Sequence, residues 1–270
     1  MPLGRMCKKA LSQGAFFVFT FLISAYVLAD RSGTACNLHE FDQIVTVAHI
    51  YDGDTFRTDT GEKIRLIGIN SPELAHGNNP EQPLAKEAHS SLSDLLATSN
   101  FRVGLHFDKD RHDRYQRLLA HVYLPDGTNV QQYLLEQGLA THIVIPPNLE
   151  HLECYAATEK NARKTGAGMW QRPEYAYRET TTLGSTDTGF HFIQGKVTHT
   201  AESKTAIWIN LEGKTALRIG KQNLGYFEPD MRKNIVGKRV QAKGWLHYNK
   251  KRKELFMQVH HPASLKVVDK

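Results

Sequence analysis

Cysteine and long apolar runs are both scarce in this chain of 270 residues. It has three cysteines, and one of them, Cys7, lies close to the N-terminus. Its fourteen histidines show no spacing typical of metal ligands, so a histidine-based metal centre is not expected. An apolar run covers residues 15–29, which is short for the ~20 residues of a membrane-spanning helix.

The first 29 residues are predicted to form a cleavable secretory signal peptide. Arg5, Lys8 and Lys9 precede the apolar run. The run ends in Val27-Leu28-Ala29, with small residues at the two positions that a signal peptidase reads. Cleavage after Ala29 would release a periplasmic or secreted protein that keeps no stable membrane association. An uncleaved anchor is the alternative.

Two cysteines, Cys36 and Cys154, remain after such cleavage. An even number in an oxidising compartment favours a disulfide. It would tie an N-terminal extension, residues 30–41, to a helix near residue 154. Two unrelated thiols are the alternative that the sequence leaves open.

Charge is distributed unevenly along the chain. Residues 30–185 hold 15 basic and 21 acidic residues, whereas residues 186–270 hold 16 basic and 7 acidic residues. Such asymmetry indicates that the C-terminal third meets nucleic acid or another anionic surface.

Hydrophobic spacing predicts an α+β protein with two folded units. Alternation indicates strands in residues 39–50, 55–59, 63–69, 101–107 and 118–124, and helical spacing indicates helices in residues 84–97, 130–137 and 149–164. A polar linker, residues 177–189, separates the first domain, residues 42–176, from the second, residues 190–270. Five short strands with a helix between the third and fourth predict a mostly-β OB-fold-like second domain.

Oxygen donors gather around a hairpin that begins at residue 52. Asp52 and Asp54 lie on a tight turn, and Asn70 and Ser71 follow the returning strand. Oxygen donors without cysteine or paired histidine favour a hard cation, Ca²⁺ or Mg²⁺. A two-residue turn at Thr60-Gly61 would place Phe56 opposite Arg65, and Asp54 and Arg65 on one side.

Three further side chains complete a set that can hydrolyse a phosphodiester. Glu73 can accept a proton from water, and Arg65 and Arg117 can clamp a phosphate and stabilise its charge. Each element alone is weak, because Asp-Gly-Asp turns are common and strand arginines are often exposed.

Taken together and in order, these motifs resemble the staphylococcal (micrococcal) nuclease family over roughly residues 42–172. The segments that carry the resemblance are DGDT (52–55), IRLIGINSPE (64–73), DRYQRLLA (113–120), EQGLA (136–140) and Met169-Trp170. The resemblance implies an OB-like five-stranded barrel with three helices. It also implies Ca²⁺-dependent hydrolysis of DNA and RNA that leaves 3′-phosphates.

The resemblance assigns a role to each matched residue. Asp54 and the Ser71 carbonyl would hold the metal, Arg65 and Arg117 would bind phosphate, and Glu73 would orient or deprotonate water. Asn70 stands where the family has a second metal-binding carboxylate, so weaker Ca²⁺ binding is expected, with Mg²⁺ or another divalent ion as an alternative.

Other positions near the matched motifs bear on substrate binding. Arg114 and Tyr115 are expected to contact nucleic acid. Gln116 replaces the family's usual glycine, in a loop where tolerance is expected. Residues 143–145 (Ile-Val-Ile) replace a tyrosine-bearing substrate wall, which puts nucleotide preference in doubt but not the reaction.

The second domain has its own candidate surface for nucleic acid. Its candidate residues are Lys250, Lys251, Arg252 and Lys253, in a turn between the last two strands, with Trp208, Trp245 and Tyr248 as possible stacking surfaces. A solvated turn with core tryptophans is the alternative.

These observations favour a monomeric, metal-dependent nuclease with little sequence specificity, acting on DNA, RNA or both. A catalytically decayed nucleic-acid-binding protein is one alternative, which the retention of Asp54, Arg65, Glu73 and Arg117 disfavours. An OB-fold adaptor that binds protein or glycan is another.

Overall fold

The computed structural model describes Cys36, residues 40–77 and residues 80–268. The expected signal peptide, residues 1–29, lies outside the described residues. Within the described part, no helix has the length and apolar character needed to cross a membrane. The described residues belong to one compact unit, which contains two barrels.

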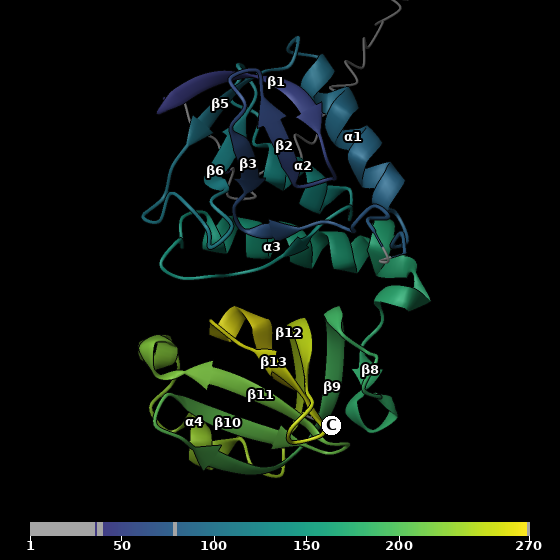
Figure 1. The fold of residues 1–270 in the computed structure, drawn as a ribbon, viewed down its shortest axis with the longest axis vertical. Helices are drawn as coiled ribbons and strands as arrows, with labels where there is room; N and C mark the ends of the chain where they lie inside the picture. The colour runs from purple at the N-terminus through teal and green to yellow at the C-terminus, as the bar shows by residue number, and fades with distance from the viewer. Residues whose placement is uncertain (1–35, 37–39, 78–79, 269–270) are drawn as a thin grey trace, which may run out of the picture. The chain divides into compact units, whose positions relative to one another are not determined.

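Five strands close the first barrel, in the order β1-β2-β3-β6-β5 (Figure 1). The strands are β1 (Gln43–Ile50), β2 (Thr55–Thr58), β3 (Lys63–Leu66), β5 (Arg102–His106) and β6 (Leu118–Tyr123). Three helices accompany them: α1 (Ala85–Ala97), α2 (Val130–Glu136) and α3 (Leu152–Thr165). Two short strands, β4 (Ile69–Asn70) and β7 (Thr141–His142), pair outside the barrel. The expected five-stranded barrel with three helices is therefore confirmed.

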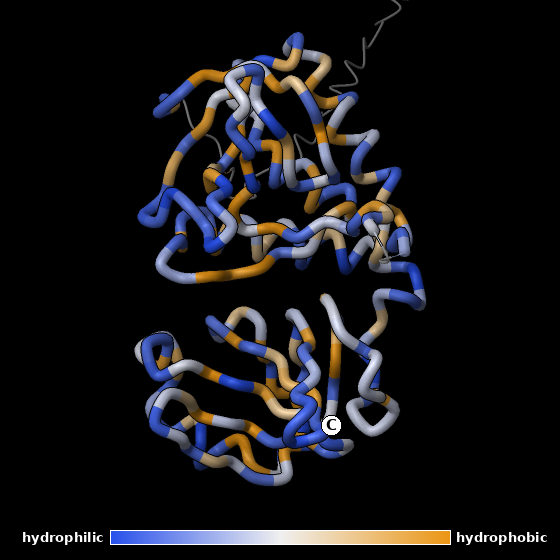
Figure 2. The backbone as a smooth tube through the Cα atoms, viewed as in Figure 1, coloured by the Kyte–Doolittle hydropathy of each residue, from blue (hydrophilic) through white to orange (hydrophobic). Residues whose placement is uncertain are grey.

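The amphipathic spacing of α1 explains how it covers the barrel. Ala88, Leu92 and Leu96 recur every four residues and are fully buried, so they share one helical face. That face belongs to the same apolar core as Phe56 and Ile64 of the barrel strands. Figure 2 shows hydrophobic and hydrophilic residues alternating along strands of both barrels.

The expected register of the first hairpin is wrong by one residue. Thr55, not Phe56, lies opposite Arg65. The cause is the turn: Gly61 adopts a φ of 96°, and the Thr58 amide donates to the Glu62 carbonyl, which leaves three residues in the loop instead of two. The long strand expected at residues 63–69 is likewise interrupted at Gly68, with a φ of 81°.

Five strands also close the second barrel, in the order β9-β10-β11-β13-β12, with β12 pairing back onto β9. Its strands are β9 (Gly189–Glu202), β10 (Ala206–Leu211), β11 (Thr215–Gly220), β12 (Arg239–Asn249) and β13 (Glu254–Gln258). The 3-10 helix η4 (Lys221–Tyr226) and α4 (Met231–Asn234) lie between the third and fourth strands, as the OB-fold expectation requires.

Two edge strands extend this barrel beyond the expectation. β14 (Leu265–Val268) pairs with β12, and β8 (Arg178–Glu179) pairs with β9. The stretch expected as a linker thus contains β8 and the 3-10 helix η3 (Thr180–Thr182). Before it, η1 (Gly168–Gln171) and η2 (Pro173–Tyr175) follow α3, and η5 (Pro262–Ser264) precedes β14.

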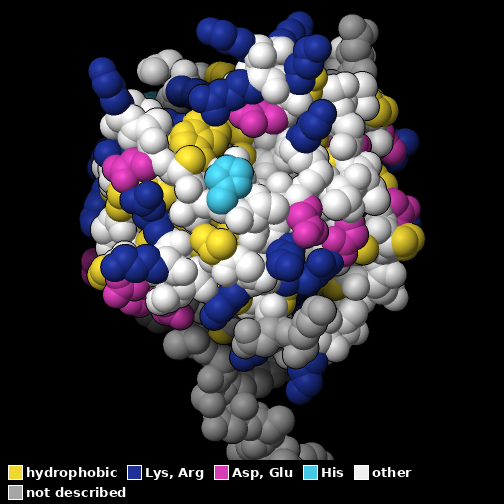
Figure 3. All heavy atoms as spheres, turned by 90° about the horizontal axis from the view of Figure 1, so that it is seen from below, with side chains coloured by type: hydrophobic (Ala, Val, Ile, Leu, Met, Phe, Trp, Pro, Cys, Tyr) yellow, Lys and Arg dark blue, Asp and Glu magenta, His cyan; other side chains and the backbone are white. Residues whose placement is uncertain are grey.

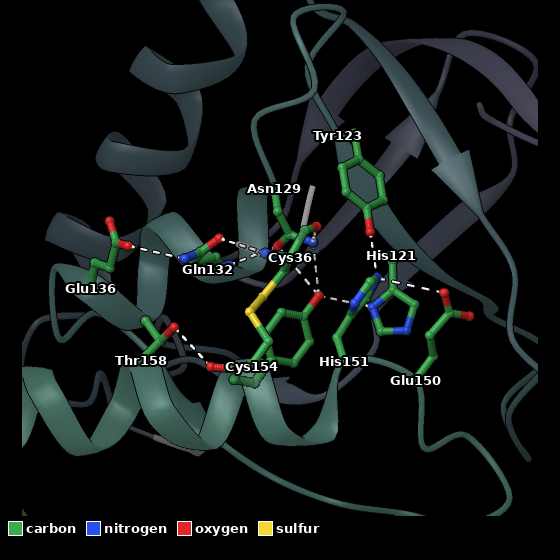
Figure 4. The surroundings of a disulfide bond; sticks show 11 residues. Cys36, His121, Tyr123, Asn129, Gln132, Glu136, Glu150, His151, Cys154 and Thr158 are labelled. Carbon is green, nitrogen blue, oxygen red and sulfur yellow. Dashed lines mark hydrogen bonds and ion pairs between the residues drawn. A yellow bond between two sulfur atoms is a disulfide. The ribbon is translucent and has the colours of Figure 1, made fainter. Parts of the chain in front are cut away.

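Cys36 and Cys154 form a disulfide that joins the N-terminal segment to α3 (Figure 4). The Cys36 amide donates to Gln132 Oε1 at 3.3 Å, and Asn129 Nδ2 donates to the Cys36 carbonyl at 3.3 Å. Asn129 also bonds the buried Tyr155 hydroxyl. The disulfide therefore lies within a polar network that includes the start of α2.

A buried ion pair links α3 of the first barrel to β12 of the second. Lys243 Nζ donates to Glu159 Oε2 at 2.6 Å, and both side chains are at most 10% exposed. Thr141 Oγ1 donates to the other Glu159 oxygen at 2.6 Å. Arg163, also on α3, lies 3.6 Å from the centroid of the Trp170 ring.

Candidate functional site

A groove of about 810 Å³ gathers six of the site residues that the sequence predicts for the first domain. Its lining includes Arg65, Asn70, Glu73, Arg114, Tyr115 and Arg117. These residues come from β3, from β4 and the chain just after it, and from the loop before β6. Segments some forty residues apart therefore meet in one depression, as the parallel pairing of β3 with β6 requires.

The acidic turn lies beside this groove and depends on glycine. Asp52 Oδ1 accepts a hydrogen bond from the Asp54 amide at 2.9 Å, which closes the turn. A Cβ on Gly53 would lie 2.8 Å from the Cβ atoms of both Ser71 and Ala88. A side chain at Gly53 would therefore push the turn away from Ser71.

Asp54 is buried and fixed by three partners. Its Oδ2 accepts a hydrogen bond from the Ser71 amide at 2.7 Å and pairs with Arg65 at 3.0 Å. Its Oδ1 accepts one from Thr55 Oγ1 at 3.0 Å. The carboxylate thus joins the turn to the chain after β4, where Asn70 and Ser71 lie.

Arg65 reaches across the site from β3. Besides Asp54, its guanidinium donates to the Leu66 carbonyl and, at 3.4 Å, to Asn70 Oδ1. These contacts fix a side chain that is only about 10% exposed. The arginine therefore presents a preorganised positive charge to the groove.

Carboxylates crowd this end of the groove. Burial, then the charge of Asp54, raises the pKa of Asp52 to about 7. Partial burial, then Asp54, also raises the pKa of Glu73, against the opposing effects of Arg65 and Arg117. Ionising all of these carboxylates together is therefore unfavourable, and a bound cation would offset that cost.

The donor set fits a hard cation, with one carboxylate fewer than the resemblance implies. Among the described residues, no group of three or more His, Cys, Asp and Glu side chains could hold a metal. A cation here would therefore depend on the Asn70 and Ser71 oxygens beside Asp54. The Ser71 hydroxyl is buried and has no hydrogen-bond partner within the described residues, and Asn70 Nδ2 donates to the Ser71 carbonyl at 3.4 Å.

Arg117 is held by a compact loop before β6. Asp113 Oδ1 accepts hydrogen bonds from the amides of Tyr115 and Arg117, and its Oδ2 accepts one from Arg117 Nε at 2.7 Å. Burial raises the pKa of Asp113, but these bonds outweigh burial and the pKa is lowered. Gln116 adopts a φ of 62°, the left-handed region that glycine enters at least cost.

Comparison with known proteins agrees with this geometry. A family model described as "Staphylococcal nuclease homologue" matches residues 63–172. A thermonuclease of Staphylococcus intermedius is 36% identical over 155 residues, which cover 56% of this chain and 90% of that protein. The chain belongs to the staphylococcal nuclease family.

Two further relatives of this family come from Bacillus subtilis (strain 168). Endonuclease YncB is 34% identical over 136 residues, which cover 48% of this chain and 63% of that protein. The SPbeta prophage-derived endonuclease YokF is 34% identical over 152 residues, which cover 54% of this chain and 47% of that protein. The family model ends at residue 172, before the second barrel begins.

The staphylococcal nuclease domain and the second barrel both line the groove. Ile143 and Ile145 form part of its wall, and Ile145 is 46% exposed. The second barrel contributes Trp245, His247 and His260. Nothing in the sequence indicated that His247 and His260 line the groove, because no local pattern shows which side chains of one barrel contact another.

Lys250, Lys251, Arg252 and Lys253 lie in the β12–β13 turn, and the described lining of the groove includes none of them. Of the three aromatic residues expected to stack on bases, Tyr248 packs against the core of the second barrel. Trp208 and Trp245 are only half-buried.

Proposed function

We propose that this protein is a metal-dependent nuclease that hydrolyses phosphodiester bonds of DNA, RNA or both, with little sequence specificity. The observation that carries the proposal is the convergence of Arg65, Glu73 and Arg117 on one groove beside the buried carboxylate of Asp54. Relatives named thermonuclease and endonuclease support the same reaction class.

The groove's own residues account for binding and proton transfer. Arg65 and Arg117 bind the scissile phosphate and stabilise the charge that accumulates on it. Both are held by carboxylates, Asp54 and Asp113, so little reorganisation is needed. Glu73, whose pKa is raised chiefly by burial, accepts a proton from the attacking water.

A divalent cation would be held by Asp54, Asn70 and the Ser71 oxygens. We propose Ca²⁺, with Mg²⁺ or another divalent ion as alternatives, because all the donors are oxygen atoms. Such an ion would polarise a phosphoryl oxygen and neutralise its charge.

We further propose a monomer that is exported to the periplasm or the medium. The apolar run and small residues before Ala29 support a signal peptide. The Cys36–Cys154 disulfide supports an oxidising compartment.

The test is a cleavage assay on single-stranded DNA, duplex DNA and RNA with Ca²⁺, with Mg²⁺ and with a chelator. We expect cleavage that the chelator abolishes, and a loss of about 10²–10⁴-fold in Glu73→Gln, as for removal of a general base. Glu87→Gln, on the exposed side of α1, is the matched control and should keep full activity.

Two outcomes would contradict the proposal. Binding of nucleic acid without cleavage under any divalent ion would favour the decayed, nucleic-acid-binding alternative. Full activity in Glu73→Gln would show that the assigned base is wrong while leaving the nuclease assignment in place.

A further inference from the structure

One face of the second barrel carries aromatic and cationic side chains on adjacent strands. Trp208 on β10 lies opposite Arg218 on β11, and Phe256 on β13 lies opposite His247 on β12. The residues that flank each of them along its strand lie in or against the barrel core. By strand alternation, these four side chains share the outer side of the sheet, where they are half-buried or exposed.

The rings follow one another at contact distance. The ring centroids of Trp208 and Phe256 are 6.1 Å apart, and those of Phe256 and His247 are 5.3 Å apart. Arg252, from the β12–β13 turn, lies 5.4 Å from the centroid of Trp208, and Arg218 lies 5.9 Å from it. We call the row Arg252, Trp208, Phe256 and His247 the aromatic strip.

The aromatic strip connects two places where arginine or lysine side chains could bind phosphate. At one end, His247 lines the groove together with Arg65 and Arg117. At the other end, Arg252 belongs to the exposed turn of residues 250–253, which is Lys-Lys-Arg-Lys. A chain of phosphates bound at both ends would have to pass along the strip.

The excess of basic residues in the second barrel suits a polyanion. Figure 3 looks at the end of the molecule where β10 lies in Figure 1, and Lys and Arg side chains spread over much of that face, with fewer Asp and Glu among them. Residues 186–270 hold 16 basic and 7 acidic residues. Charge complementarity therefore favours nucleic acid over an acidic or neutral protein partner.

Exposed aromatic rings favour binding of an unpaired strand over binding of a duplex. Bases in a duplex already stack on each other, whereas unpaired bases are free to stack on aromatic side chains. The strip lies on the second, fourth and fifth strands and the fourth–fifth turn of an OB-type barrel. The second strand and the fourth–fifth turn are places where such barrels bind oligonucleotides.

We propose that the aromatic strip binds single-stranded nucleic acid and leads it from the β12–β13 turn to the groove. This inference rests on the proposed function, because it makes an unpaired strand the preferred substrate of the same site. It adds a binding surface outside the matched family region of residues 63–172.

Binding is measured with the full chain carrying Glu73→Gln, in chelator, so that no cleavage occurs. The probes are a labelled single strand of about 20 nucleotides, longer than the about 4–16 that one such barrel covers, and a duplex of equal length. Trp208→Ala and Phe256→Ala should each weaken single-strand binding about tenfold, within the range for one lost base stack. The duplex affinity should change much less.

Tyr226→Ala is the matched control. Tyr226 is 39% exposed on the same barrel and contacts His261, away from the strip. It should bind both probes as the parent does. Phe256→Tyr keeps a ring and should restore single-strand binding, which separates stacking from a folding defect.

Three results would overturn the inference. They are unchanged single-strand binding in both alanine variants, equal losses for single strand and duplex, and an equal loss in Tyr226→Ala. The cleavage assay with Glu73 intact is independent of these measurements. A protein that cleaves while its strip variants bind normally contradicts the strip alone, and one that binds through the strip without cleaving contradicts the nuclease proposal alone.

Discussion

Asp54 and Arg65 form a buried ion pair at 3.0 Å, and Arg65 extends from it to Asn70 Oδ1 at 3.4 Å. Asn70 therefore contacts the same arginine that pairs with Asp54. A carboxylate at position 70 would add negative charge beside this ion pair. The proposed cation site thus has a neutral amide where a carboxylate would bind the cation more strongly, and a single substitution can test this.

Asn70→Asp is expected to tighten binding of a divalent ion, because affinity at oxygen sites rises with the charge of the ligands. The ion concentration that gives half-maximal cleavage should fall by about tenfold. Asn161→Asp adds the same charge at an exposed position of α3 and should leave that concentration unchanged. An unchanged requirement in Asn70→Asp would show that residue 70 does not contact the ion.

Arg117→Lys is expected to lower kcat/KM by about 100-fold, although it keeps the charge, because lysine lacks the planar fork that binds phosphate at two points. Steady-state kinetics on a defined oligonucleotide measures the loss. Arg111→Lys, in the same loop but stacked 4.5 Å from the Phe107 ring centroid, is the control. Equal effects of the two changes would contradict the assigned phosphate contact.

Local patterns predicted the elements better than their register. Strand alternation and turn residues located β2 and β3, but a one-residue difference in loop length shifted the pairing of Arg65 from Phe56 to Thr55. The contact between Asp54 and Arg65 survived the shift, because Asp54 lies in the turn before β2 and is not bound by the pairing. Turn length is set by a glycine φ that composition alone does not report.

Contacts between segments far apart in the chain could not be predicted from local sequence patterns. The family motifs located Glu73 and Arg117, but nothing local indicated that His247 would line the groove or that Lys243 would be buried against Glu159. A lysine within a strand is expected to be exposed, and Lys243 is buried only because it pairs with Glu159, which is 84 residues away in the chain. The strand β14 (Leu265–Val268) was missed because it has only four residues, LKVV, and these do not alternate regularly between apolar and polar.

The Glu159–Lys243 pair predicts a characteristic pattern of stability losses. Glu159→Gln should destabilise the protein by about 3–5 kcal/mol, because it leaves the buried charge of Lys243 unpaired. Lys243→Met should cost less, because Arg163 still pairs with Glu159 at 3.5 Å. The double variant should recover most of the loss. Urea denaturation measures each free energy of unfolding, and additive losses would mean that the two side chains do not interact in solution.

The same pair predicts a dependence on acid. Burial raises the pKa of Glu159, but Lys243, then Arg163, outweighs burial and lowers it to about 2, from an ordinary value of 4.5. A carboxyl with a lowered pKa stabilises the fold above its unfolded pKa. That contribution should be lost as the pH falls from about 4.5 toward 2. Melting temperatures across this range should fall more steeply in the wild type than in Glu159→Gln; parallel curves would contradict the assignment.

The Cys36–Cys154 disulfide closes a separation of 118 residues, and its loss should be costly. Cys36→Ser/Cys154→Ser is expected to lower the free energy of unfolding by about 2–5 kcal/mol, since the unfolded chain regains the freedom that the cross-link removes. Denaturation of the wild type with and without a thiol reductant provides the matched comparison. Reduced wild type should unfold like the double serine variant, and the variant should not respond to reductant. If the reductant leaves the wild type unchanged while the serine variant is weakened, the loss comes from the polar network around Gln132 and Asn129 and not from the cross-link.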